Sequence, residues 1–347
     1  YAAPNYPYTC YDVLYRTPRQ HVGGCLWHSF DHQRGYHPDP FYGGLMDVFR
    51  QPKYSYYMFQ AQRSPKKQDR LFETGPMVYI AHEMTPFSPK DVTVYSNCDE
   101  VRLTYNKGGK SLTYTKPVSR EGMPSPIITF KDVYNFMIDK NMSMKEGRQK
   151  EVFLLAEGLI NGKVVATHKV CPARRPSKLL LWIDNENTEL KADGSDFVTV
   201  IAAIADKNGN IKRLNNYYVK FHIEGEGRIL GGANVLANPA PVKWGTAPIL
   251  VQSTLKPGKI KITASVLFEG SQMPVSAELE LESKPSAYPL IYASEEAALI
   301  PMKSDSQSFP ITAKSQKELE KEKAVKEQNE RKLKEVEQQQ ADFGEKK

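Results

Sequence analysis

Short runs of alternating apolar and polar residues dominate the middle of the chain. In residues 70–175 these runs are PMVYIAH, VTVYSN, VRLTY, SLTYT and EVFLLAEG. They are rich in β-branched and aromatic residues, and their close spacing without a helical period is typical of a β-sandwich. Asn161-Gly162 separates EVFLLAEG from VVATHKV, and Asn-Gly between two such runs is a strong hairpin signal. We therefore predict one β-sandwich over residues 70–175.

A second set of runs indicates another sandwich over residues 177–285. They are LLLWI, FVTVIAAIA, YYVKFHI, APILVQ, IKITASV and VSAELEL. Cys171–Pro176, which contains two prolines, is the predicted linker between the two sets. Asp206–Asn210 faintly resembles the start of a calcium-binding loop, but no Glu follows at the twelfth position. The turn-forming residues favour a hairpin turn there instead.

The pattern differs in residues 1–66, which look like α/β sequence. VGGCLW is a short apolar run that fits a buried parallel strand, and a long polar loop follows it. FRQPKYSYYMFQAQR then predicts a helix with Pro52 in its first turn and apolar residues at helical spacing: Tyr54, Tyr57, Met58 and Ala61. Strand, loop and helix form one unit of a larger parallel architecture, which a segment of this length cannot close alone.

Residues 286–347 predict a linker followed by a charged helix. Glutamates precede lysines or arginines by four residues at several places, as in Glu322 and Lys326. The apolar residues of this segment are too sparse for a sustained coiled-coil heptad. We expect a solvated helix that lies against a neighbouring domain.

Composition narrows the possible functions. The chain has 347 residues and a formal net charge of +7, spread along its length without a dense basic block. That distribution disfavours nucleic-acid binding, and no apolar run reaches the roughly 18 residues of a membrane span. The cysteines lack CxxC spacing, so structural zinc is not expected. Because residue 1 is Tyr and no signal segment follows, we expect the chain to be the C-terminal part of a longer protein.

The segment Trp27–Tyr42 carries the densest candidate chemistry, because four of the seven histidines lie between His21 and His37. A metal site would use His28 and His32, but their spacing of four fits a pair only on a helix, and nearby glycines and prolines indicate a loop. A purely structural role in a long ordered loop is a second reading. The third is a carbohydrate subsite, in which an aromatic ring stacks on a sugar and polar groups bind its hydroxyls.

Several stretches resemble glycoside hydrolase family 2, which includes β-galactosidases, β-glucuronidases and β-mannosidases. The stretch from Gly23 to Pro65, with GGCLW and GGLMD before RQPK and paired tyrosines, resembles the last strand, loop and helix of the family's (β/α)8 catalytic barrel. VYSNCDEVRL resembles the start of the immunoglobulin-like domain that follows. ADGSDFVTVIAAIADKNGNIKR, GEGRILGGAN and KWGTAPILVQSTLKPGKIKI resemble a further sandwich domain of galactosidase-like members.

The resemblance implies a mostly β chain: the end of a (β/α)8 barrel, two immunoglobulin-like β-sandwiches and a C-terminal helix. It implies a retaining mechanism with two catalytic glutamates on earlier barrel strands. Residues 1–72 contain no glutamate, so we expect no catalytic residue in this chain. By the same resemblance Trp27 forms a wall of the subsite beside the scissile bond. His28 stands where relatives often have Asp or Asn, and the remaining candidate substrate contacts are Asp31, His32 and Arg34.

Three functions follow from these observations. The favoured one is the C-terminal portion of a β-galactosidase-like retaining glycosidase, inactive as this chain alone, with a carbohydrate substrate, no metal or cofactor and a possible homo-oligomeric state. The alternative is a non-catalytic carbohydrate-binding or interaction protein of immunoglobulin-like domains, which has no reason to keep the barrel segment. A complete enzyme that uses His28 with Asp31 is disfavoured, since no Ser or Cys nucleophile stands in a recognisable setting. Resemblance to polysaccharide-degrading members suggests a periplasmic or extracellular location.

Overall fold

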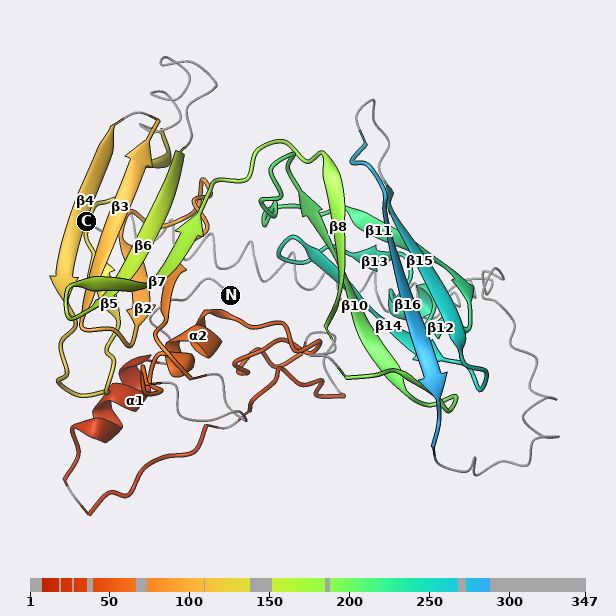
Figure 1. Ribbon diagram of the computed structural model, residues 1–347, viewed down its shortest axis with the longest axis horizontal. Helices are drawn as coiled ribbons and strands as arrows, with labels where there is room; N and C mark the ends of the chain where they lie inside the picture. Colours follow the sequence, from red (N-terminus) through yellow and green to blue (C-terminus); the bar gives the residue numbers. More distant parts are fainter. Residues whose placement is uncertain are drawn as a thin grey trace, which may run out of the picture.

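The computed structural model describes residues 8–18, 20–26, 28–35, 40–66, 74–108, 110–137, 152–184, 188–267 and 273–287. Strands dominate this part of the chain, as the sequence predicts. They form two pairs of packed sheets, and Figure 1 shows the pairs at opposite sides of the molecule. The two short helices of the N-terminal segment, α1 (Tyr8–Tyr15) and α2 (Tyr54–Gln60), lie beside the first pair.

The first sandwich packs a three-stranded sheet against a four-stranded one. The smaller sheet has the order β1-β2-β5 and the larger has the order β4-β3-β6-β7. Their inner faces share one mostly aliphatic core, rich in valines and including Val94 and Leu103, with Tyr105, Tyr134 and Phe130 as its aromatic members. The strands are β1 (Val78–Ala81), β2 (Val92–Ser96), β3 (Glu100–Lys107), β4 (Ser111–Pro117), β5 (Ile128–Phe130), β6 (Val152–Ile160) and β7 (Lys163–Val170).

The predicted hairpin at Asn161-Gly162 is confirmed. It joins β6 to β7, which pair antiparallel from Ile160 opposite Lys163 outward. Both turn residues have positive φ, 51° and 73°, as a two-residue type I′ turn requires. Because glycine adopts such angles without steric cost and asparagine tolerates them, this dipeptide suits the turn.

The second sandwich packs the sheet β12-β14-β10-β8 against the sheet β13-β11-β15-β16-β9. Its core is almost entirely aliphatic, with Phe221 as the aromatic exception. The strands are β8 (Lys178–Asp184), β9 (Lys191–Ala192), β10 (Phe197–Ala205), β11 (Tyr218–Gly225), β12 (Gly227–Ile229), β13 (Ala240–Pro241), β14 (Thr246–Ser253), β15 (Gly258–Leu267) and β16 (Ala277–Pro285), with a 3-10 turn, η1 (Ala233–Val235).

The predicted turn at Asp206–Asn210 is also confirmed. The Asp206 carboxylate accepts the backbone N–H groups of Asn208 and Asn210, and the Asn210 side chain donates to it at 3.1 Å. The same carboxylate accepts the Arg174 N–H at 2.9 Å. The predicted linker residues, which form no helix or strand, are thereby held to the second sandwich.

The predicted buried strand at Val22–Trp27 is wrong for the residues that the structure describes. Residues 21–26 form no strand, and the side chains of Val22 and Cys25 are exposed. A strand is held by hydrogen bonds to neighbouring strands, and this segment pairs with no strand in the described part of the chain. An apolar run shows that a segment can be buried as a strand, but a strand forms only where another strand lies beside it.

The predicted helix is confirmed but shorter than its pattern. It begins at Tyr54 after the N-cap Lys53, so Pro52 lies just before the helix and not in its first turn. Tyr54, Met58 and Ala61 are buried, as their spacing predicts.

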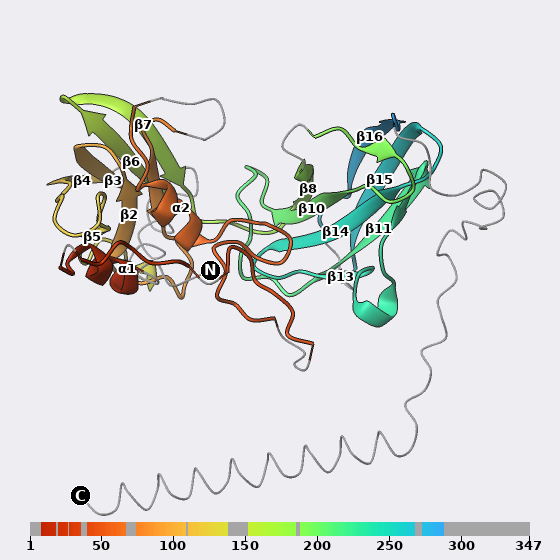
Figure 2. The same ribbon diagram turned by 90° about the horizontal axis from the view of Figure 1, so that it is seen from below.

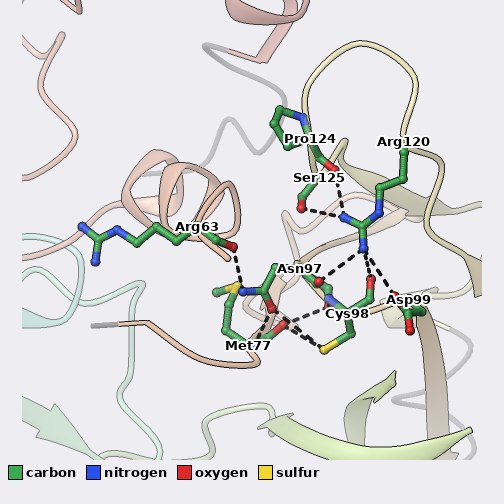
Figure 3. A network of polar contacts seen from close by, with 9 residues as sticks. Arg63, Met77, Asn97, Cys98, Asp99, Arg120, Pro124 and Ser125 are labelled. Atoms are coloured by element: carbon green, nitrogen blue, oxygen red, sulfur yellow. Dashed lines mark hydrogen bonds and ion pairs between the residues drawn. The ribbon is translucent and has the colours of Figure 1, made fainter. Parts of the chain in front are cut away.

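A polar network fastens the end of this helical segment to the first sandwich (Figure 3). The Asn97 side chain accepts the Met77 N–H and donates to the carbonyl oxygens of Arg63 and Gly75. Beside it, the Arg120 guanidinium donates to the carbonyl oxygens of Asn97 and Cys98 and to the Ser125 hydroxyl. The contacts fix the chain just after α2 against the turn between β2 and β3.

The predicted C-terminal helix lies outside the described residues, which end at Ala287. Within the described parts of the chain, no helix has the length and apolar character needed to cross a membrane. The domain boundaries proposed from the sequence stay a prediction.

Candidate functional site

The histidine loop, here residues 28–35 and 40–44, is closed by contacts between its own arms. The Phe41 N–H donates to the His32 carbonyl at 2.9 Å. At Gly44 the arms approach so closely that a Cβ would lie 2.2 Å from the opposing backbone, so only glycine fits there. The loop therefore has a defined shape rather than an open, solvent-filled one.

A buried ion pair holds this shape from inside. The Lys53 ammonium lies 2.6 Å from Asp31 Oδ1, and the two side chains are only 7% and 2% exposed. The Gly44 N–H donates to the same carboxylate oxygen at 2.9 Å, and Lys53 also donates to the Tyr42 carbonyl at 3.1 Å. Two charges buried this deeply are stable together because each compensates the other, and both arms of the loop contribute contacts.

Asp31 therefore lies inside the loop, with its carboxylate directed at Lys53. These contacts favour a positioning role for Asp31. The substrate contact that the sequence predicts for Asp31 stays a prediction. The sequence reasoning missed Lys53. Its partner Asp31 lies 22 positions earlier in the chain, and no spacing in the sequence announces the pair.

The outer side of the loop carries a cluster of rings. The His28 and His32 rings lie 4.2 Å apart, and the Phe41 ring lies 5.2 Å and 5.5 Å from them. The Arg34 guanidinium lies 5.6 Å from the centre of the Phe41 ring. Desolvation and the neighbouring His32 lower the pKa of His28 below its ordinary value, which favours the neutral ring that can both donate and accept a hydrogen bond.

Three of the five predicted substrate contacts thus come together on one side of the loop: His28, His32 and Arg34. Phe41, which the sequence reasoning did not single out, joins them. Trp27 lies outside the described residues, and its predicted role stays a prediction. His28 has a φ of 92°, an unusual angle for a residue with a side chain, and it is held by the surrounding loop.

Helix α2 connects this loop to the first sandwich through stacked aromatic rings. Tyr57 stacks on Tyr79 of β1 with centroids 3.7 Å apart, and Tyr79 stacks on His168 of β7 at 4.5 Å. The Tyr54 hydroxyl donates to Glu83 at 3.3 Å, and burial raises the pKa of Tyr54 far above its ordinary value. The loop is therefore carried on a rigid base.

The arrangement offers no obvious metal site within the described part of the chain, where no three His, Cys, Asp or Glu side chains gather closely enough to hold an ion. What the ring cluster presents is a mixed surface of aromatic faces, imidazole nitrogens and a guanidinium. Such a surface suits a ligand with both apolar faces and hydroxyl groups.

Comparison with known proteins identifies the family that the chain resembles. Residues 181–267 match the family model described as glycoside hydrolase family 2 C-terminal domain 5. The chain is 32% identical over 273 residues to a β-galactosidase of Thermoanaerobacter pseudethanolicus, a match that covers 76% of this chain and 34% of that protein. It is 28% identical to the β-galactosidase BoGH2A of Bacteroides ovatus over 70% of this chain and 27% of that protein.

Among solved structures, a β-glucuronidase from glycoside hydrolase family 2 superposes with a TM-score of 0.60 at 22% sequence identity. That match covers 83% of this chain and 28% of the other, and at this identity it establishes the shared fold alone. The chain thus spans about a third or less of the length of the relatives that it matches. The resemblance predicted from the sequence is confirmed: this chain is related to the C-terminal part of family 2 glycoside hydrolases.

Proposed function

We propose that this chain is the C-terminal portion of a retaining β-glycosidase of the β-galactosidase-like kind. In this proposal residues 1–66 complete the end of a (β/α)8 barrel, and the two sandwiches are immunoglobulin-like domains that support it. The two catalytic glutamates belong to a part of the protein outside this chain, and the substrate is a terminal β-linked sugar of an oligo- or polysaccharide. Export to the periplasm or cell surface belongs to the same proposal.

The observation that carries the proposal is the support of the histidine loop. The rings of His28, His32 and Phe41 belong to a loop that the Asp31–Lys53 pair holds in shape, and that pair is buried and bound by both arms of the loop. Binding sites work best when side chains that touch the ligand are held by a second layer of fixed contacts. A buried charge pair is a costly way to fix a turn, and here it holds the loop in one defined shape.

The chemistry of the loop fits the sugar that a β-glycosidase holds beside its scissile bond. A pyranose presents apolar C–H groups to an aromatic ring and hydroxyls to polar groups. Trp27 would supply the stacking ring, while His28, His32 and Arg34 would exchange hydrogen bonds with hydroxyls. Retaining hydrolysis itself needs a pair of carboxyl groups about 5 Å apart, which the rest of the protein would supply.

The test is to express the longer protein that the proposal requires and to measure hydrolysis of nitrophenyl β-galactoside and β-glucuronide. We expect turnover by the longer protein, release of the β-anomer first in NMR spectra, and no turnover by the 347-residue chain alone. Absence of β-glycosidase activity in the longer protein, or enzyme-like rates in this chain, would sink the proposal.

Variants of the loop sharpen this test. His32→Ala and Trp27→Ala should each lower kcat/KM about tenfold or more, because both remove a contact to the bound sugar. His222→Ala, which removes an exposed histidine of the second sandwich, is the matched control and should leave kcat/KM unchanged. Kinetics equal to those of the control in both His32→Ala and Trp27→Ala would show that neither side chain contacts the substrate.

A further inference from the structure

A cavity of about 450 Å³ lies where the N-terminal segment meets both sandwiches. One wall comes from α2 and the residues before it, a second from the end of β1, and a third from the outer face of β8 and β10 with the turn before β14. Figure 2 shows the N-terminal segment running beside β10 and β14 of the second sandwich. Its size lies within the range of about 300–1,000 Å³ that is typical of small-molecule sites.

Two of the three tryptophans of the chain line this cavity, Trp182 and Trp244. Trp182 lies on the outer face of β8, opposite Ile201 of β10 in the strand register. Its neighbours Leu181 and Ile183 point the other way, into the core. The outer face of a sheet is usually polar where it meets solvent, so an outward tryptophan beside a buried isoleucine marks a surface built to be covered.

Trp244 stands at a position that the backbone disfavours. It and Gly245 form the turn between Lys243 and Thr246, and their φ angles are 53° and 82°. Asparagine, aspartate or glycine is the usual residue at such a left-handed turn position, and a bulky side chain there is strained. Strain of this kind persists where the side chain has a task, and here the tryptophan faces the cavity.

Polar groups at the same cavity are already held in place. Arg213 lies 3.2 Å from the Glu83 carboxylate and donates to the Trp244 carbonyl at 3.2 Å. The other oxygen of Glu83 accepts the Tyr54 hydroxyl. These contacts join the N-terminal segment and both sandwiches, so the polar end of the cavity is set before any ligand arrives.

The charges that line the cavity are balanced. Arg50 and Arg213 stand with Glu83 and Asp184, and a third cation, Lys53, is neutralised by its buried carboxylate partner. A site for a strongly anionic ligand would show an excess of positive groups. Balanced charges beside two indole rings favour a neutral ligand with apolar faces and many hydroxyls.

We infer that this cavity is a binding site for a neutral oligosaccharide. One or two sugar rings would stack on Trp182 and Trp244, and their hydroxyls would bind the carboxylates and guanidinium groups around them. The site performs no chemistry on the sugar; it holds a stretch of glycan against the junction of the two sandwiches. The inference rests on the proposed function only for the choice of sugars to test.

The experiment is a titration of the 347-residue chain with four neutral β-linked trisaccharides, of galactose, glucose, mannose and xylose. Binding is followed by calorimetry and by tryptophan fluorescence, which should change because two of the three tryptophans line the cavity. Trp244→Gly should weaken binding about tenfold or more, as loss of an aromatic anchor does. Since glycine relieves the strained turn, this variant should melt no lower than the parent chain.

Leu236→Gly is the matched control. Leu236 also has a positive φ, 54°, but it lies at the end of η1 and does not line the cavity. It should show the same relief of strain and unchanged sugar binding. Failure of all four trisaccharides to bind, or equal affinity in Trp244→Gly, would overturn the inference. Binding to this chain is independent of hydrolysis, so a longer protein without β-glycosidase activity would overturn the proposed function and leave this site standing.

Discussion

The cores of the two sandwiches differ in the types of side chain that they contain. The buried core of the first contains Tyr105 and Tyr134, and His82 and His168 lie buried or half-buried beside it. The core of the second is composed of valine, isoleucine, leucine and alanine, with Phe221 among them. The second is also the part that matches a family model, over residues 181–267.

The difference follows from what each sandwich must contact. The first carries α2 and the histidine loop, and tyrosines and histidines give it rings that stack on neighbours while their polar atoms find partners. His168 shows both uses, since it stacks on Tyr79 and accepts the Ile80 N–H at 3.0 Å. The core of the second sandwich is filled by the inner faces of its own two sheets, and aliphatic side chains fill such a core without polar atoms that need hydrogen-bond partners.

The largest expected effect tests the aliphatic core. Phe221→Ala should destabilise the second sandwich by about 3–5 kcal/mol, because it leaves a cavity among residues that cannot collapse to fill it. Peptide-resolved hydrogen exchange should show faster exchange in β11 and β15 and little change in β3 and β6. Phe197→Ala, on β10, is the control: Phe221 is 2% exposed and Phe197 is 50% exposed, so the control should change stability by about 0.5 kcal/mol or less. Equal effects of the two variants would contradict the assignment of the core.

A smaller and more local effect is expected in the N-terminal segment. Lys53→Ala leaves Asp31 buried without its cation and should destabilise the histidine loop by about 3 kcal/mol. Limited proteolysis should then cut the loop faster while both sandwiches stay intact. The control is Lys131→Ala, which removes a solvent-exposed partner of Asp91 and should change loop proteolysis and stability little. Loss of both sandwiches on Lys53→Ala would mean that the pair supports the whole fold.

The smallest expected effect is a difference in acid stability between the two sandwiches. Burial lowers the pKa of both His82 and His168 below the ordinary value of about 6.5. The unfolded chain therefore binds protons that the folded chain excludes, so stability is complete above about pH 6.5 and declines as the pH falls below it. Between pH 7.5 and pH 5 the melting temperature of the first sandwich should fall more than that of the second.

Substitution at single histidines sharpens this pH test. His168→Gln keeps an acceptor for the Ile80 N–H and should reduce the acid sensitivity of the first sandwich. His222→Gln removes an exposed histidine of the second sandwich and should leave both melting curves unchanged. Equal acid sensitivity of the two sandwiches in the parent chain would contradict the role of the buried histidines.

The strands were predictable because their signal is local. Every long run of β-branched and aromatic residues between Pro76 and Leu281 forms a strand, and the turns at Asn161-Gly162 and Asp206 follow from their own side chains. The short strands β5, β9, β12 and β13 were not predicted, since two or three residues carry no readable alternation. The run at Val22–Trp27 failed for the opposite reason, because its pattern is clear but no strand in the described residues pairs with it.

The candidate site was predictable only in part. His28, His32 and Arg34 lie close in sequence, and the loop brings them together on one side. The burial of Asp31 depends on Lys53, which lies 22 positions away and becomes a neighbour only after the chain turns back. Trp182 and Trp244 share one cavity with Glu83, but they come from separate elements, and no spacing along the chain reveals that meeting.

The contacts of the Asp206 carboxylate limit how the two sandwiches can move relative to one another. By accepting the Arg174 N–H it makes the linker after that point part of the second sandwich, and Lys212 adds a contact to the Ala173 carbonyl at 3.3 Å. Any rotation of one sandwich against the other must then pivot at Cys171 and Pro172, where proline already restricts φ to about −65°. The joint between the sandwiches is therefore short, with two residues between the last strand of the first sandwich and the segment bound to the second.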